Sequence, residues 1–72
     1  MHSRDEVKNT VQAARRDRGI TQEELAQAVG VTRQTIISIE KGNYVPSVLL
    51  ALKISHFFKL TVEDLFNVSR KT

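Results

Sequence analysis

The fold of this chain is decided by residues 19–42, which read Gly-Ile-Thr-Gln-Glu-Glu-Leu-Ala-Gln-Ala-Val-Gly-Val-Thr-Arg-Gln-Thr-Ile-Ile-Ser-Ile-Glu-Lys-Gly. Thr21 and Glu24 form a capping box, the pattern that starts a helix. Gly30 is the residue type that ends one, because glycine adopts the left-handed conformation found just past helix ends. Thr32 then caps a second helix after a three-residue turn. We therefore predict two short helices joined by a tight turn.

The apolar residues of this stretch indicate how the two helices pack. Leu25 and Val29 recur at helical spacing on one side of the first helix, and Ile36 and Ile39 do so on the second. Ala26 has to be small because the two helix backbones meet there at close range. This arrangement is typical of a helix-turn-helix, in which the second helix enters the major groove of DNA.

The second helix, at about residues 32–41, turns a mixed set of side chains away from the core. They are Arg33, Gln34, Ile37, Ser38 and Lys41. Arg33 suits bidentate contact with a guanine edge, and Gln34 with an adenine edge. An isolated Arg-Gln pair is more often a solvated surface, but the surrounding helix-turn-helix spacing favours base reading. Ile37 faces either a thymine methyl group or the rim of the core.

The chain before this motif is predicted to form another helix. Ser3 and Glu6 make a capping box, and Val7 and Val11 begin one apolar stripe at helical spacing. Gly19 closes this helix.

Two further helices are predicted after the motif. Pro46 disfavours a helical conformation for the residue before it, so a loop precedes the helix over Ser47–Phe58. That helix is apolar over most of its circumference, which predicts burial on more than one side and makes one side a candidate contact with a partner chain. Thr61 caps a last short helix that ends near Phe66, and residues 67–72 are interpreted as a frayed tail.

The fold class is therefore predicted as all-α, because no segment shows the period-two alternation of a strand. We expect a compact five-helix domain over residues 4–66 and a short C-terminal tail over residues 67–72. A chain of 72 residues has room for one domain, and its 40% hydrophobic and 26% charged residues are ordinary for a folded protein.

The composition also narrows the function. The absence of cysteine excludes disulfides, thiolate catalysis and the common structural zinc sites. The two histidines, His2 and His56, have no neighbours at a spacing that would make a catalytic or metal site, so we expect no enzyme activity, no cofactor and no metal. The net charge of +3 permits nucleic acid as a partner without proving it.

Membrane and secretory segments are not expected. The longest apolar run, Val48–Leu52, is far too short to cross a bilayer. The start of the chain, Met1–Glu6, lacks the apolar stretch of a secretory signal. We therefore expect a cytoplasmic protein without a membrane partner.

Residues 19–66, with the helix before them, resemble the Cro/C1-type (XRE) family of helix-turn-helix transcriptional regulators. The resemblance rests on the stretch Gly19–Ile36, on Ile39-Glu40-Lys41-Gly42-Asn43 and on Pro46-Ser47. Each motif alone is weak, whereas their combination is highly specific. The resemblance implies a lambda-repressor-like DNA-binding domain and sequence-specific binding of double-stranded DNA.

The resemblance also implies a role for each matching residue. The base-reading positions are Arg33, Gln34, Ile37 and Ser38, of which Ile37 departs from the small or polar residue usual in relatives. The positions implied to contact DNA phosphates are Gln22, Thr32, Lys41 and Asn43. Arg15 and Glu40 match an ion pair that ties the first helix to the end of the recognition helix. The alternative is that Arg15 is a free surface charge without a structural role.

A homodimer is expected, because one short recognition helix reads too few bases and two half-sites double the contacts. The predicted interface is the last helix with the adjoining part of the helix before it, and its residues are Phe57, Leu65, Phe66 and Val68. Leu49 stands where relatives commonly carry a charge, and it is expected to be exposed.

The function predicted from the sequence is that of a regulator whose partner is an inverted-repeat DNA operator, with no small-molecule effector implied. The alternative is a helical protein-interaction module, antitoxin-like or bridging, that does not read DNA. A steep fall of duplex affinity with salt distinguishes the two, since only the first releases counterions from phosphates.

Overall fold

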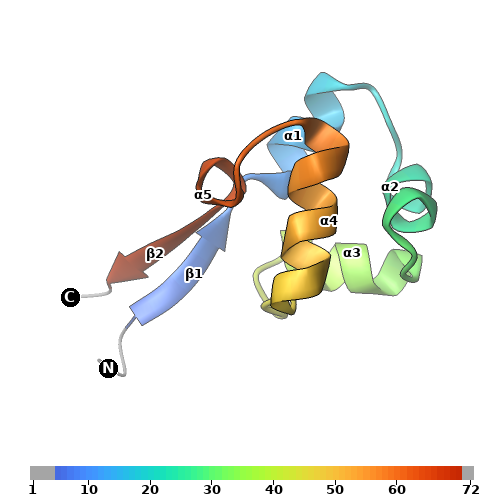
Figure 1. The fold of residues 1–72 in the computed structure, drawn as a ribbon. Helices are drawn as coiled ribbons and strands as arrows, with labels where there is room; N and C mark the ends of the chain where they lie inside the picture. Colours follow the sequence, from blue (N-terminus) through green and yellow to red (C-terminus); the bar gives the residue numbers. More distant parts are fainter. Residues whose placement is uncertain (1–4, 71–72) are drawn as a thin grey trace.

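The computed structural model describes residues 5–70 of the chain. Its elements follow in the order β1 (Asp5–Asn9), α1 (Val11–Asp17), α2 (Gln22–Val29), α3 (Arg33–Glu40), α4 (Val48–Phe58), α5 (Val62–Leu65) and β2 (Phe66–Arg70). Four helices form the body, and α5 is a single turn that leads into a two-stranded antiparallel sheet at one side, whose strands are far apart in the sequence (Figure 1).

The core draws apolar side chains from all five helices. Its largest fully buried members are Val11, Leu25, Ile36, Ile39, Ile54 and Leu65. Burying one such side chain contributes about 1.5–3 kcal/mol, so these positions are the main source of stability. Ala26, at 1% exposure, lies in this core beside the α2–α3 contact, which agrees with the small residue expected there.

The predicted helix starts are confirmed in α2, α3, α4 and α5. In α2, the Thr21 hydroxyl accepts from the Glu24 backbone N–H at 3.0 Å while the Glu24 carboxylate accepts from the Thr21 N–H at 2.7 Å. The hydroxyls of Thr32 and Ser47 cap α3 and α4 in the simpler one-way manner. Each cap satisfies backbone N–H groups that have no partner within the helix.

The tight turn between α2 and α3 depends on Gly30. This residue has φ +76°, in the left-handed region, and the chain there leads directly into the Thr32 cap. The turn sets the angle between α2 and α3, which make the most extensive contact between any two helices.

The all-α prediction is wrong at both ends of the described chain. Residues 5–9, expected to lie in the first helix, form β1, and α1 begins only at Val11. The expected cap at Ser3 lies outside the described residues. Residues 67–70, expected to be a frayed tail, belong to β2.

The two strands pair antiparallel, from Asp5 opposite Arg70 to Asn9 opposite Phe66. The pairing is anchored at Thr10, whose backbone N–H donates to the Leu65 carbonyl at 2.9 Å and whose hydroxyl donates to the Asp64 carbonyl at 3.0 Å. These two bonds dock the start of α1 onto α5. Once they form, the segments on either side must run next to each other, and strand pairing satisfies their backbone groups.

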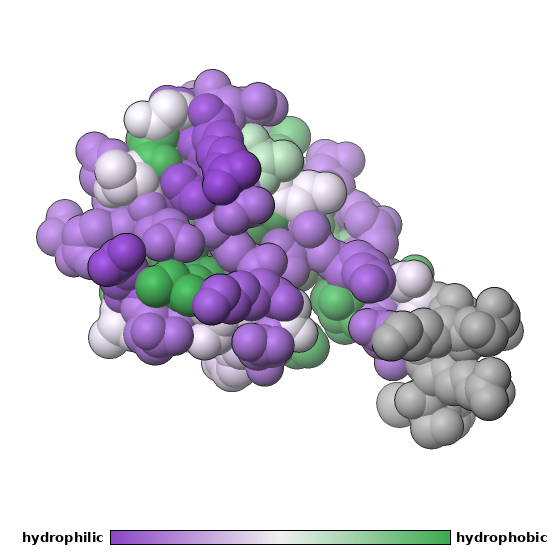
Figure 2. Space-filling view, turned by 180° about the vertical axis from the view of Figure 1, so that it is seen from behind, coloured by the Kyte–Doolittle hydropathy of each residue, from purple (hydrophilic) through white to green (hydrophobic). Residues whose placement is uncertain are grey.

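One face of the molecule is mainly polar (Figure 2). The side opposite to the view of Figure 1 is covered mainly by hydrophilic residues (Figure 2). None of the helices in residues 5–70 is both long enough and apolar enough to span a membrane.

Candidate nucleic-acid interface

The outward face of α3 carries the four side chains predicted to read bases. Arg33 and Gln34, in the first turn of the helix, are exposed, while Ile37 and Ser38 are half-buried. The Gln34 amide Nε2 lies 3.5 Å from the Ser38 hydroxyl, one helical turn further on. Ile37 thus keeps part of its surface outside, beside the polar residues, and part against the body of the protein.

The residues predicted to contact phosphates surround this face. Thr32 precedes α3, and its hydroxyl accepts from the Thr35 backbone N–H at 3.3 Å. Lys41 and Asn43 follow α3 and are exposed. The Asn43 backbone N–H donates to the Ser38 carbonyl at 2.9 Å, which closes the end of the helix and fixes where the loop leaves it.

Arg15 and Glu40, predicted as a pair, are brought together by the fold. Arg15 Nε donates to Glu40 Oε2 at 2.7 Å and Arg15 Nη2 to Oε1 at 3.2 Å, so the contact is bidentate. Their side chains are 10% and 2% exposed, respectively. A bidentate pair at this burial has strong directional geometry and joins α1 rigidly to the last residue of α3.

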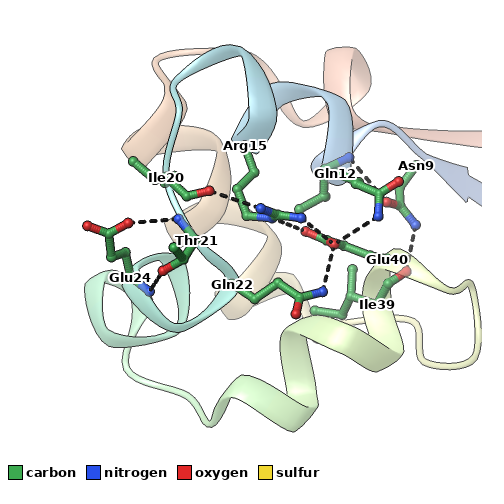
Figure 3. A network of polar contacts seen from close by, with 10 residues as sticks. Asn9, Gln12, Arg15, Ile20, Thr21, Gln22, Glu24, Ile39 and Glu40 are labelled. Atoms are coloured by element: carbon green, nitrogen blue, oxygen red, sulfur yellow. Dashed lines mark hydrogen bonds and ion pairs between the residues drawn. The ribbon is translucent and has the colours of Figure 1, made fainter.

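Two glutamines complete the shell around Glu40 (Figure 3). Gln22, the first residue of α2, donates through Nε2 to Glu40 Oε1 at 3.1 Å. Gln12, on α1, donates through Nε2 to the same Glu40 oxygen at 3.5 Å. Arg15 Nη1 donates to the Ile20 carbonyl at 2.9 Å. Through the Glu40 carboxylate, the network therefore connects the end of α3 to α1 and to the start of α2.

The network holds Glu40 ionised. Burial alone would raise the pKa of the Glu40 carboxyl, but the hydrogen bonds from Arg15 and Gln22 and the charge of Arg15 outweigh burial and lower it below the ordinary value. The hydrogen bond to Glu40 correspondingly raises the pKa of the Arg15 guanidinium. Both groups stay charged at neutral pH and hold the helices as an ion pair.

Gln22 both contacts Glu40 and lines an open cleft at the protein surface. One of its two Nε2 hydrogens is donated to Glu40, which leaves the other for a further acceptor. Gln22 also lines an open cleft of about 690 Å³ between α1, the start of α2 and the start of α3, together with Arg16 and Arg33. The cleft thus brings a predicted phosphate contact, Gln22, next to a predicted base reader, Arg33.

Sequence reasoning missed Gln12 and Asn9 in this site. Asn9 Nδ2 donates to the Ile39 carbonyl at 2.9 Å, from the end of β1 to the last turn of α3. Gln12 lies three residues before Arg15 on the same face of α1, and this spacing was the available signal. The bond of Asn9 to Ile39 has no local signal, because that partner is 30 residues away.

The predicted dimer-interface residues are placed differently from one another. Leu65 is fully buried in the core of its own chain, so its assignment to a partner contact is wrong. Phe57 and Phe66 are partly buried against that core. Only Val68, on β2, is largely exposed, at 74%. Leu49 is exposed, as expected.

Two short helices joined by a tight turn, with an exposed polar face on the second and a buried ion pair behind it, define a helix-turn-helix domain. Residues 11–65, about three quarters of the chain, match the helix-turn-helix family. The protein belongs to the Cro/C1-type (XRE) helix-turn-helix family of transcriptional regulators, a family of DNA-binding domains and not an enzyme class.

Similar proteins come from both bacteria and archaea. The chain is 55% identical to the uncharacterized HTH-type transcriptional regulator YgzD of Bacillus subtilis over 60 residues, which span 83% of this chain and 91% of that protein. It is 52% identical, over the same shares, to the uncharacterized HTH-type transcriptional regulator MJ0272 of Methanocaldococcus jannaschii.

The fold also matches solved structures. The crystal structure of the transcriptional regulator VanUg superposes with a TM-score of 0.78, covering 97% of this chain and 93% of that one, at 22% identity. At that identity the likeness shows the fold alone.

Proposed function

We propose that the protein is a sequence-specific, double-stranded DNA-binding transcriptional regulator that acts as a homodimer and places α3 in the major groove. The observation that carries the proposal is the outward face of α3, which no other part of the described chain covers at Arg33 and Gln34. The ion pair of Arg15 and Glu40 supports the same helix from behind. A rigidly held helix with exposed planar donors in its first turn is suited to reading base edges.

The roles follow from chemistry and position. Arg33 and Gln34 would make bidentate contacts with guanine and adenine, Ser38 would bond either kind of base edge, and the exposed part of Ile37 would meet a thymine methyl group. Phosphate contacts would set the register of the helix. They would come from Gln22, Thr32, Lys41 and Asn43, which flank α3 at both ends.

A homodimer on an inverted repeat matches these roles. An eight-residue helix such as α3 reaches few base pairs, and two copies one helical turn apart reach twice as many. The two-fold symmetry of a dimer would then appear as two-fold symmetry in the operator.

The experiment that tests the proposal is selection from a random duplex DNA pool with the purified protein at two salt concentrations. Enrichment of an inverted repeat is expected, with affinity falling steeply between the two salts because several phosphates are neutralised. The matched control is the double variant Arg33→Ala, Gln34→Ala, which keeps the phosphate contacts and should bind DNA without enriching the same sequence. Recovery of unenriched DNA by the unaltered protein would favour the protein-interaction alternative.

A further inference from the structure

The exposed apolar side chains of this protein are concentrated in one place. Seven large hydrophobic residues are exposed in the described chain, and five of them lie within residues 44–52. We define these five as the α4 surface: Tyr44 (45% exposed), Val45 (60%), Val48 (77%), Leu49 (64%) and Leu52 (41%). The other two, Leu60 and Val68, lie on the α4–α5 loop and on β2.

This surface is the second apolar side of α4. The inner side of the helix is buried in the core through Leu50, Ile54 and Phe58. Val48 and Leu52, four residues apart, share the outer side. The sequence predicts burial of α4 on more than one side, and a single copy of the chain covers only the inner one.

The charge distribution indicates what kind of partner fits. The chain carries no charged residue between Lys41 and Lys53, a gap that includes the whole α4 surface. Interface cores are depleted of charge and enriched in aromatic residues such as Tyr44. Two identical uncharged surfaces meet around a two-fold axis without bringing like charges together. The surface is thus compatible with itself.

The position of the surface agrees with a two-fold arrangement on DNA. Half-sites one helical turn apart lie about 34 Å from each other, so each α3 must lie within about 17 Å of the two-fold axis. The α4 surface begins at Tyr44, only four residues after α3 ends at Glu40. An extended chain spans at most about 3.3–3.6 Å per residue, so Tyr44 lies within about 14 Å of the end of α3, and an axis through this end of the surface keeps both recognition helices near enough.

We infer that a second copy of this chain covers the α4 surface and that this contact, not one centred on α5 and the sheet, makes the dimer. The inference rests on the proposed function, because the DNA site is incomplete without a second recognition helix. The expected interface residues are Val45, Val48 and Leu52, with Tyr44 and Leu49 at its edges.

The test compares two valine substitutions in sedimentation equilibrium without DNA. Val48→Glu places a charge on the α4 surface, and Val68→Glu places the same charge on β2 at a position of nearly equal exposure, 77% against 74%. Val48 is the first residue of α4, where an acidic side chain favours the helix, so folding is expected to persist. Circular dichroism and thermal unfolding check that both variants fold.

The unaltered protein and Val68→Glu are expected to sediment as dimers, and Val48→Glu as the 8.2 kDa monomer. Dissociation of Val68→Glu as well as Val48→Glu would overturn the inference, because the contact would then depend on β2 and not on the α4 surface alone. A folded Val48→Glu that stays dimeric, or an unaltered protein that is monomeric throughout the concentration range, would overturn it. In the second case the surface would be left for a different protein.

A DNA measurement separates this inference from the proposed function. Val48→Glu keeps α3 unchanged, so its affinity for a single half-site should equal that of Val68→Glu, which carries the same added charge. Its affinity for the inverted repeat should fall on the order of 100-fold, because the second half-site is no longer tethered. If the protein is a dimer but enriches no DNA sequence, the proposed function is contradicted and the proposed interface is not. A monomer that enriches a single half-site would overturn this interface and the homodimer part of the proposed function, but it would support base reading by α3.

Discussion

The carboxamide of Asn9 joins β1 to the end of α3, since its Nδ2 donates to the main-chain carbonyl of Ile39 at 2.9 Å. Its Oδ1 accepts from the Val11 backbone N–H at 3.2 Å, at the start of α1. The residue at the N-cap position of α1, Thr10, makes no side-chain cap of its own. One side chain therefore serves the beginning of one helix and the end of another.

Replacement of Asn9 by alanine should lower the free energy of unfolding by about 1–3 kcal/mol, because it leaves two partly buried backbone groups without partners. Urea denaturation measures this loss. Asn9→Asp separates the two bonds: it keeps the acceptor for Val11 but sets a carboxylate oxygen against the Ile39 carbonyl, so it should also be less stable than the unaltered protein. Equal stability of Asn9→Ala and the unaltered protein would show that water replaces both bonds.

The stability of the protein should depend on Glu40 in acid. The pKa of Glu40 is lower in the folded protein than its ordinary value. Between these two pKa values the folded state therefore binds fewer protons than the unfolded state. The stabilising effect is complete above the ordinary glutamate pKa of about 4.3 and is lost as the pH falls below it. Unfolding free energies measured from pH 7 down to pH 3 should show this decline.

Glu40→Gln should be less stable at pH 7, by up to about 3–5 kcal/mol, because Arg15 then lies buried without its counter-charge. Its stability should also fall less between pH 6 and pH 3 than that of the unaltered protein. Parallel pH profiles for the two proteins would mean that other carboxylates cause the acid sensitivity.

Arg33→Ala should cost about 1–3 kcal/mol of binding at one base pair of the operator and relax the preference there. Lys41→Ala is the comparison, since loss of a phosphate contact weakens binding to all sequences alike and reduces its salt dependence. Competition binding with single-base operator variants distinguishes the two. A uniform loss for Arg33→Ala would assign Arg33 to phosphate.

Lys59 ends α4 with φ +57°, and no other non-glycine residue of the described chain has a positive φ. This left-handed conformation costs an L-residue roughly 1–2 kcal/mol, whereas glycine adopts it freely. Lys59→Gly should therefore raise the unfolding free energy, by about 1 kcal/mol or less, because glycine also gains freedom in the unfolded chain. Thermal unfolding at pH 7 measures the gain. Lys59→Ala, which keeps the strain and removes the charge, should not reproduce it.

Local signals predicted the central helices well. The caps at Thr21, Thr32, Ser47 and Thr61 lie within four residues of the backbone groups they satisfy, so the sequence contains both partners of each bond at close range. The apolar stripes of α2 and α3 likewise depend only on helical periodicity. These elements could be predicted because their causes are local.

The sheet could not be predicted in the same way. Phe66 and Val68 alternate with polar residues, but four or five residues at a chain end are too few to distinguish a strand from a tail. Val7 and Val11 are spaced as in a helix, yet Val7 pairs with Val68. That pairing depends on how Thr10 docks onto α5, which only the folded core determines.

In the candidate site, too, some contacts could be predicted from the sequence and others depend on the tertiary fold. The contact of Arg15 with Glu40 follows from a family resemblance, while the contributions of Asn9 and Gln12 appear only in three dimensions. The α4 surface was visible in the sequence as an excess of apolar residues in α4. Which of them the chain itself covers could not be judged before the core was assembled, and Leu65 was assigned to the wrong side for this reason.

The antiparallel pairing of β1 with β2 also bears on the order in which the chain folds. The paired residues are about sixty positions apart, so their meeting closes almost the whole chain into a loop. Closure of so long a loop is entropically costly until the intervening helices have compacted. The sheet should accordingly be the last element to form and the first to open, with its amide hydrogens exchanging faster than those of α2 to α4. The helix-turn-helix would then persist through openings that separate the two ends of the chain.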